Sequence, residues 1–166
     1  SSAASDVYKR QILLCAHWDS RFIADNDVSN IDKPILGAND GGSGVGVLLE
    51  LARQISINPI DIGIDIILFD IEDQGQPNSE TNQKEHTWCL GSQYWAKSPH
   101  VEGYFADYGI LLDMVGGKDA KFTKEGVSMH FASRVVEKIW KTATDLGYSD
   151  FFLSKKTPPI IDDHLY

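Results

Sequence analysis

The chain has 166 residues, of which 42% are hydrophobic and 23% are charged, as expected for an ordinary globular domain with one core. Its formal net charge is −9, and a surface this acidic repels phosphate backbones, so nucleic acid is not an expected partner. No run approaches the roughly 18 consecutive apolar residues of a membrane span. The two cysteines, Cys15 and Cys89, have no C-x-x-C partner, which excludes a cysteine zinc site.

The two ends of the chain look unlike its middle. Residues 1–11 are small and polar and run straight into an apolar stretch, so we expect them to be a non-native leader. At the other end, Tyr166 follows a histidine-bearing segment without a closing helix or strand. We therefore expect residues 12–166 to be part of a larger domain that is incomplete at both ends.

Segments typical of strands alternate with segments typical of helices. Short apolar or β-branched runs predict strands at 12–16, 62–69, 108–114 and 151–153. Because helices are expected between them, the alternation predicts an α/β fold with three layers. Its mainly parallel, mixed sheet should have helices on both faces.

The predicted helices follow from apolar spacing. The first begins in the glycine-rich stretch 37–44, where Asn39 or Asp40 is well placed to cap it. A short helix is expected at 88–97 and a long one at 127–146, which Gly147 should end. The expected apolar face of the long helix consists of Phe131, Val135, Ile139 and Trp140.

Acidic and imidazole side chains collect where the predicted strands end. In open α/β sheets, ligands bind at the carboxyl ends of the strands, so these side chains should converge on one cleft. The residues expected there are His17, Asp40, Glu72, Asp73 and Asp113. Asp19 and the acidic residues of the loop at 20–36 are instead expected to be solvated.

A divalent cation would explain this gathering. Several carboxylates at one sheet edge repel one another, and without a cation at least one would hold a proton near neutral pH. Calcium and magnesium prefer shells made of oxygen alone, whereas an imidazole with carboxylates suits zinc. Taken alone, His17 is more often a hydrogen-bonded interior histidine, but the pattern at three successive strand ends favours a metal site.

The adjacent pair Glu72–Asp73 suggests a division of roles. Neighbouring side chains in extended chain point opposite ways, so one should bind the metal and the other handle a proton, a role that suits the longer arm of Glu72. Alone, such a pair is more often a surface turn. The glycines at 41–46 permit close helix–sheet packing, and no Lys-Ser/Thr pair follows them, which excludes a P-loop.

Five motifs in the same order resemble the zinc exopeptidases of metallopeptidase family twenty-eight. They are H-W-D-S-R at 17–21, G-A-N-D-G-G-S-G at 37–44, I-I-L-F-D-I-E-D at 66–73, L-L-D-M-V-G at 111–116 and D-D-H at 162–164. T-W-C-L-G-S-Q-Y-W-A at 87–96 and I-D-D-H look most like bacterial glutaminyl-peptide cyclotransferases (glutaminyl cyclases). The resemblance implies that residues 12–166 are part of a catalytic domain with the zinc aminopeptidase fold.

The resemblance also implies roles for individual residues. Asp40 and Asp73 would bind zinc, and Glu72 would be the general acid–base. In the one-zinc cyclases, Asp113 would join Glu72 and Asp162 in a carboxylate network. In the two-zinc aminopeptidases, His17 and Asp113 would hold the second zinc. Many aminopeptidases have serine at the place of Asp162.

Three functions follow, of which a glutaminyl cyclase acting on the N-terminus of a peptide or protein is the first choice. The alternative is an aminopeptidase that hydrolyses the first peptide bond. A non-catalytic domain of the same fold is less consistent with the retained metal-type residues. The family's last zinc ligand is a histidine in a W-H-T-like segment beyond D-D-H, so residues 1–166 alone should bind zinc weakly. Family members usually work outside the cytoplasm, which predicts a periplasmic or secreted protein.

Overall fold

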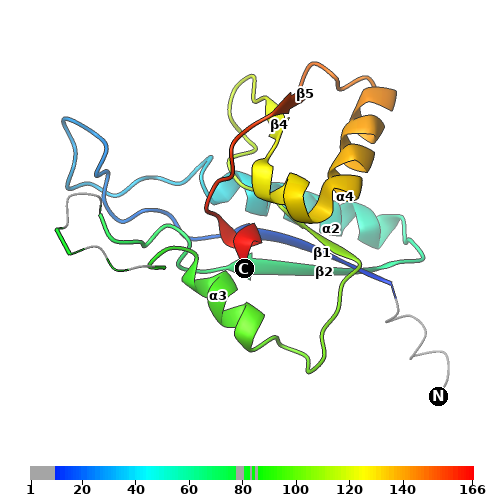
Figure 1. Ribbon diagram of the computed structural model, residues 1–166, viewed down its shortest axis with the longest axis horizontal. Helices are drawn as coiled ribbons and strands as arrows, with labels where there is room; N and C mark the ends of the chain where they lie inside the picture. The colour runs from blue at the N-terminus through cyan, green and yellow to red at the C-terminus, as the bar shows by residue number, and fades with distance from the viewer. Residues whose placement is uncertain (1–9, 78–80, 83, 85) are drawn as a thin grey trace.

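The structure is a computed structural model that describes residues 10–77, 81–82, 84 and 86–166 (Figure 1). Most of the expected leader, residues 1–11, lies outside the described residues. Of its two described residues, Gln11 is the first residue of strand β1. Within the part that the structure describes, no helix combines the length and the hydropathy needed to cross a bilayer.

Three parallel strands form the central sheet, in the order β2-β1-β3. They are β1 (Gln11–His17), β2 (Gly63–Phe69) and β3 (Tyr108–Leu111). A second sheet pairs β4 (Phe122–Lys124) with β5 (Phe152–Lys156), also in parallel. The helical elements are α2 (Gly42–Ile57), α3 (Leu90–Lys97), α4 (Gly126–Asp145) and the short 3-10 helix η1 (Asp163–Leu165).

Helices cover both faces of the central sheet, as predicted for this fold class. Figure 1 shows α2 and α4 on one side of β1 and β2 and α3 on the other. On the α2 side, Leu14 and Ala16 of β1 pack against Leu48, which is 1% exposed. On the opposite side, the ring of Phe69 at the end of β2 meets Trp95 of α3 edge-on. The alternation of side chains along β1 and β2 therefore fills two separate layers.

The helices and strands lie close to their predicted positions, with some differences. The described strands form two parallel sheets instead of one mixed sheet. The three residues of β4 are too few to give a periodic signal, so the sequence pattern does not predict this strand. The third strand ends at Leu111 instead of residue 114, and the chain turns shortly afterwards at Met114, whose φ is +48°.

The predicted cap of α2 is wrong. Gly41 occupies the N-cap position with φ +80°, and no side chain among the described residues caps the helix. The side chain of Asn39 accepts a hydrogen bond from the N–H of Gly116 instead, and the carboxylate of Asp40 lies against His17. Contacts with neighbouring strand ends have thus displaced the local capping bond.

The predicted apolar face of α4 is partly wrong. Phe131 is 80% exposed, whereas Val136 and Ala143 are buried. Ala132 has non-helical backbone angles, so the helix changes phase there and the spacing read across this point fails. The predicted end is confirmed, because Gly147 follows the helix with φ +86°.

The start of α2 lies directly on the ends of the strands. A Cβ atom at Gly44 would lie 2.1 Å from the carbonyl oxygen of Leu112 and 2.9 Å from Cβ of Ala16. Only glycine permits this approach without a shift of backbone. The contact holds Asp40, just before α2, close to Asp113, just after Leu112.

Gly44→Ala and Gly46→Ala provide a matched test of this contact. Gly44→Ala should lower the free energy of unfolding by about 1–3 kcal/mol, because the new methyl group meets the Leu112 carbonyl. A Cβ atom at Gly46 would have nothing within 4 Å, so Gly46→Ala should stabilise the protein by about 0.5–1 kcal/mol through helix propensity. Urea denaturation of both variants measures the difference, and equal effects would contradict the proposed close packing.

Candidate metal and proton-transfer site

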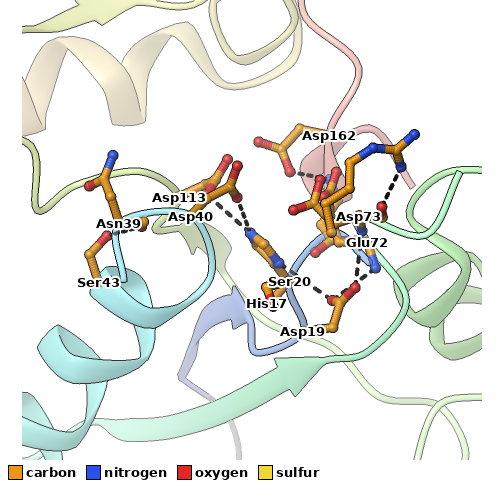
Figure 2. Close-up of polar contacts among 12 residues, drawn as sticks. His17, Asp19, Ser20, Asn39, Asp40, Ser43, Glu72, Asp73, Asp113 and Asp162 are labelled. Carbon is orange, nitrogen blue, oxygen red and sulfur yellow. Dashed lines mark hydrogen bonds and ion pairs between the residues drawn. The ribbon is translucent and has the colours of Figure 1, made fainter. Parts of the chain in front are cut away.

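The carboxyl ends of the three central strands lie at the same edge of the sheet, because the strands are parallel (Figure 2). His17 is the last residue of β1, Asp113 follows β3, and Glu72 and Asp73 follow β2. Asp40 approaches from the turn before α2. Asp162 comes from the C-terminal segment just before η1. All the predicted site residues are therefore brought to one region.

His17 is the buried centre of this region, with no exposed surface. Its Nε2 lies 3.1 Å from Oδ1 of Asp40 and 3.1 Å from Oδ1 of Asp113. Burial alone would lower the pKa of His17, but the hydrogen bonds with Asp113 and Asp40 outweigh it and raise the pKa to about 11. Without a metal ion, His17 is therefore a cation that holds two carboxylates together.

The other nitrogen of His17 is not satisfied. Nδ1 lies 3.4 Å from Oδ1 of Asp19 but makes no hydrogen bond with any residue that the structure describes. Asp19 is engaged elsewhere, because its two oxygens accept the backbone N–H groups of Glu72 and Asp73, each at 3.1 Å. The expectation that Asp19 is a solvated loop residue is therefore wrong. Asp19 fixes the backbone of the pair that follows β2.

Glu72 and Asp73 each lie with a different group of side chains, although their two carboxylates also interact with each other. A carboxylate oxygen of Asp73 lies with donor atoms of His17 and Asp40, all within 4.8 Å of one another. A carboxylate oxygen of Glu72 lies with atoms of Cys89 and Asp162, again within 4.8 Å. The first group consists of metal-type ligands, and the second is a buried cluster of acidic and thiol groups.

The first group fits zinc by its donor chemistry. Imidazole and carboxylate groups are typical zinc ligands. Burial raises the pKa of Asp73, and the neighbouring carboxylate of Asp40 raises it further. A bound cation would relieve this repulsion. His17, Asp40 and Asp73 therefore form the candidate metal site.

The second group favours protonated acids. Burial, then the charges of Asp73 and Asp162, raise the pKa of Glu72 to about 8. Burial, then the charge of Asp113, raise the pKa of Asp162 to about 7. The thiol of Cys89 donates to Oε1 of Glu72 at 3.4 Å, and burial raises the pKa of this thiol, which keeps it protonated. Glu72 can therefore exchange a proton near neutral pH.

The D-D-H segment is held by contacts that the sequence did not reveal. Oδ1 of Asp163 accepts the hydroxyl of Ser92 in α3 at 2.6 Å. Nε2 of His164 pairs at 3.1 Å with Glu125, whose carboxylate also caps the first turn of α4. Asp162 is thus anchored between α3 and α4. No local sequence pattern predicts Ser92 and Glu125 as partners of this segment, because they lie far from it along the chain.

Comparison with known proteins gives the family. Residues 2–165 match peptidase family M28. A comparison with curated proteins finds no match. Among solved structures, a glutaminyl cyclase from Tannerella forsythia is 55% identical with a TM-score of 0.92, over 96% of this chain and 55% of that one.

Two other solved proteins are similar to the same degree. A Zn-dependent exopeptidase from Parabacteroides distasonis and a glutaminyl cyclase from Bacteroides thetaiotaomicron, bound to N-acetylhistamine, are each 53% identical. Both have a TM-score of 0.92 over 95% of this chain and 55% of theirs. The chain thus spans about half the length of the solved proteins it matches. The match over almost all of its residues shows that the chain belongs to peptidase family M28.

Proposed function

We propose that the protein is a zinc-dependent glutaminyl cyclase, which converts the N-terminal glutamine of a peptide to pyroglutamate and releases ammonia. The observation that carries the proposal is the buried cluster of Glu72 with Asp162, within 4.8 Å. By resemblance, cyclases have aspartate at the place of Asp162, where many aminopeptidases have serine. The glutaminyl cyclases at 53% and 55% identity support the proposal.

The side chains divide the reaction between them. Of the candidate metal site, Asp40 and Asp73 would hold the single zinc of a cyclase, which would supply a Lewis acid for the γ-carbonyl of the glutamine, while His17 would stay paired with Asp113. Glu72 takes a proton from the α-amine, whose nitrogen then forms a bond to the γ-carbonyl carbon. The bond from this carbon to the side-chain amide nitrogen breaks, and Glu72 gives its proton to the departing ammonia. The carboxylate thus ends the cycle as it began.

The surroundings of Glu72 suit a group that both takes and gives a proton. General acid–base catalysis works best when the pKa of the group lies near the working pH. Burial and the nearby charges raise the pKa of Glu72 from 4.5 to about 8 in the metal-free protein. Asp162 contributes to this effect directly, and Asp113 raises the pKa of Asp162 in turn.

The second candidate is an aminopeptidase, which the position of His17 favours. Its Nε2 lies 3.1 Å from carboxylate oxygens of Asp40 and Asp113. Two ligand atoms on one tetrahedral zinc lie about 3.4 Å apart, which is close to these distances. His17, Asp40 and Asp113 could therefore hold a second zinc. Glu72 would then deprotonate water for attack on the first peptide bond. The exopeptidase at 53% identity is as similar as the cyclase at that value.

Metal content and reaction products separate the two candidates. The complete gene product should contain one zinc ion per chain, measured by elemental analysis. When it is incubated with Gln-Ala, it should release ammonia and form pyroglutamyl-alanine. Mass spectrometry detects this product. Two zinc ions and release of free glutamine would instead establish the aminopeptidase.

Glu72→Gln tests the proton carrier. The substitution keeps the shape of the side chain but removes its basicity, so kcat should fall by about 10²- to 10⁴-fold. Glu50→Gln on the exposed surface of α2 is the matched control and should leave kcat unchanged. Zinc content should stay the same in both variants. Unchanged turnover in Glu72→Gln would instead favour a non-catalytic role for the domain.

Protons and zinc compete for the same cluster of carboxylates. In the metal-free protein, the pKa is raised from 4.5 to about 8 for Glu72 and from 3.8 to about 7 for Asp162. The folded state therefore binds protons more tightly than the unfolded chain does, and ionisation at higher pH destabilises it. The raised pKa of His17 acts in the same direction, since its stabilisation is complete below pH 6.5 and is lost towards about pH 11.

The metal-free protein should therefore lose stability as the pH rises from about 5 to about 8. Zinc should restore stability increasingly over this range, because it replaces the protons. Thermal unfolding with and without a chelator measures both trends. In Glu72→Gln, which cannot ionise at this position, the slope for the metal-free protein should be smaller. A Tm of the metal-free protein that climbs with pH would refute this account of the charges.

A further inference from the structure

Arg21 is a buried cation beside the proposed site, with 8% of its surface exposed. Its Nη1 donates to the carbonyl oxygen of Asp73 at 2.6 Å and to that of Gly75 at 3.0 Å. Its Nε and Nη2 form a two-point pair with the carboxylate of Asp25, at 2.8 and 2.7 Å. The guanidinium therefore links the loop at 20–36 to the backbone that follows β2.

The plane of the guanidinium is also fixed by packing. Its central carbon lies 4.4 Å from the centre of the Trp88 ring. A Cβ atom at Gly75 would lie 2.2 Å from the same ring, so the backbone at Gly75 packs directly on Trp88. Trp88 precedes Cys89, which contacts Glu72. Arg21 and the segment 73–75 thus share one rigid aromatic support.

The segment that Arg21 holds has no regular secondary structure of its own. It begins with Ile71, a β-branched residue with φ +57°, where such a side chain is strained. Two residues of H-W-D-S-R, Asp19 and Arg21, hold this segment through its backbone. Asp19 accepts its N–H groups, and Arg21 donates to its carbonyl groups.

We propose that Arg21 is a positioning residue that sets the geometry of the metal ligand Asp73 and of the proton carrier Glu72. It does so through the backbone, by donating to the carbonyl oxygens of Asp73 and Gly75. Its positive charge also offsets repulsion between the two carboxylates. The catalytic part of the inference rests on the proposed function, whereas the effect on metal binding does not.

The arrangement requires arginine and not simply a positive charge. Three nitrogens of one planar group serve two carbonyl oxygens and a carboxylate, while the face of the group stacks on Trp88. The single ammonium of lysine cannot reproduce this planar fork or its stacking. Arg21→Lys therefore keeps the positive charge but loses the planar hydrogen-bonding group and its stacking on Trp88.

The test compares Arg21→Lys with Arg53→Lys in the complete gene product. Arg53 pairs with Glu50 on the surface of α2 and serves as the matched control. Zinc affinity is measured by competition with a chromophoric chelator, and kcat and KM are measured with Gln-Ala. Arg21→Lys should bind zinc about 10- to 100-fold more weakly and lower kcat by a similar factor at saturating zinc, with KM changed less than about 3-fold. Arg53→Lys should leave all three values unchanged.

Zinc affinity and kcat equal to those of the unchanged protein would overturn the inference, even if Arg21→Lys lowered Tm. If Arg21→Lys does not fold, Asp25→Asn decides, because it weakens the pair that orients Arg21 and leaves Arg21 in place. Asp25→Asn should weaken zinc binding by at least about 3-fold, and no change would overturn the inference. If the unchanged protein binds zinc but does not cyclise Gln-Ala, the proposed function fails, and zinc affinity alone tests Arg21.

Discussion

Repulsion among buried carboxylates is the constraint on which this region of the protein depends. Glu72, Asp73 and Asp162 are each at least nine-tenths buried, and Asp40 and Asp113 lie beside them around His17. So many negative charges cannot share a poorly solvated space unless protons or cations compensate them. In the metal-free protein, the imidazolium of His17 and the guanidinium of Arg21 supply positive charge, and the raised pKa values of Glu72 and Asp162 favour their neutral forms. The positions of these compensating groups determine which chemistry the site can perform.

The groups that compensate the negative charge are distributed unevenly, so the neighbouring carboxylates of Glu72 and Asp73 have different properties. Asp73 faces His17 and Asp40, where a cation is expected, whereas Glu72 faces the thiol of Cys89 and the acid of Asp162. A change of one position along the backbone thus separates metal binding from proton transfer. The strained backbone at Ile71, with φ +57°, lies just before this pair and turns it into the site.

Much of this could be predicted from the sequence, because periodicity and parallel topology act together. Apolar runs located β1 and β2, and the parallel arrangement then required that His17, Glu72 and Asp73 meet at one edge. The contributions of Asp19 and Arg21 could not be predicted, since each acts on backbone groups more than fifty positions away. The role of Asn39 is hidden for the same reason, because its partner is the N–H of Gly116.

The parallel sheet also has a consequence for how the protein folds. Every strand next to β1 in the central sheet joins it through a long crossover, and the proposed ligands come from separate crossovers. Closing each crossover loop costs conformational entropy before the strand contacts that compensate for this loss can form, so such pairings form slowly. The candidate metal site of His17, Asp40 and Asp73 can therefore exist only after β1 has paired with β2 across their crossover. A polypeptide that ends before D-D-H would already contain Asp40 and Asp73 but would lack Asp162, the acid beside Glu72.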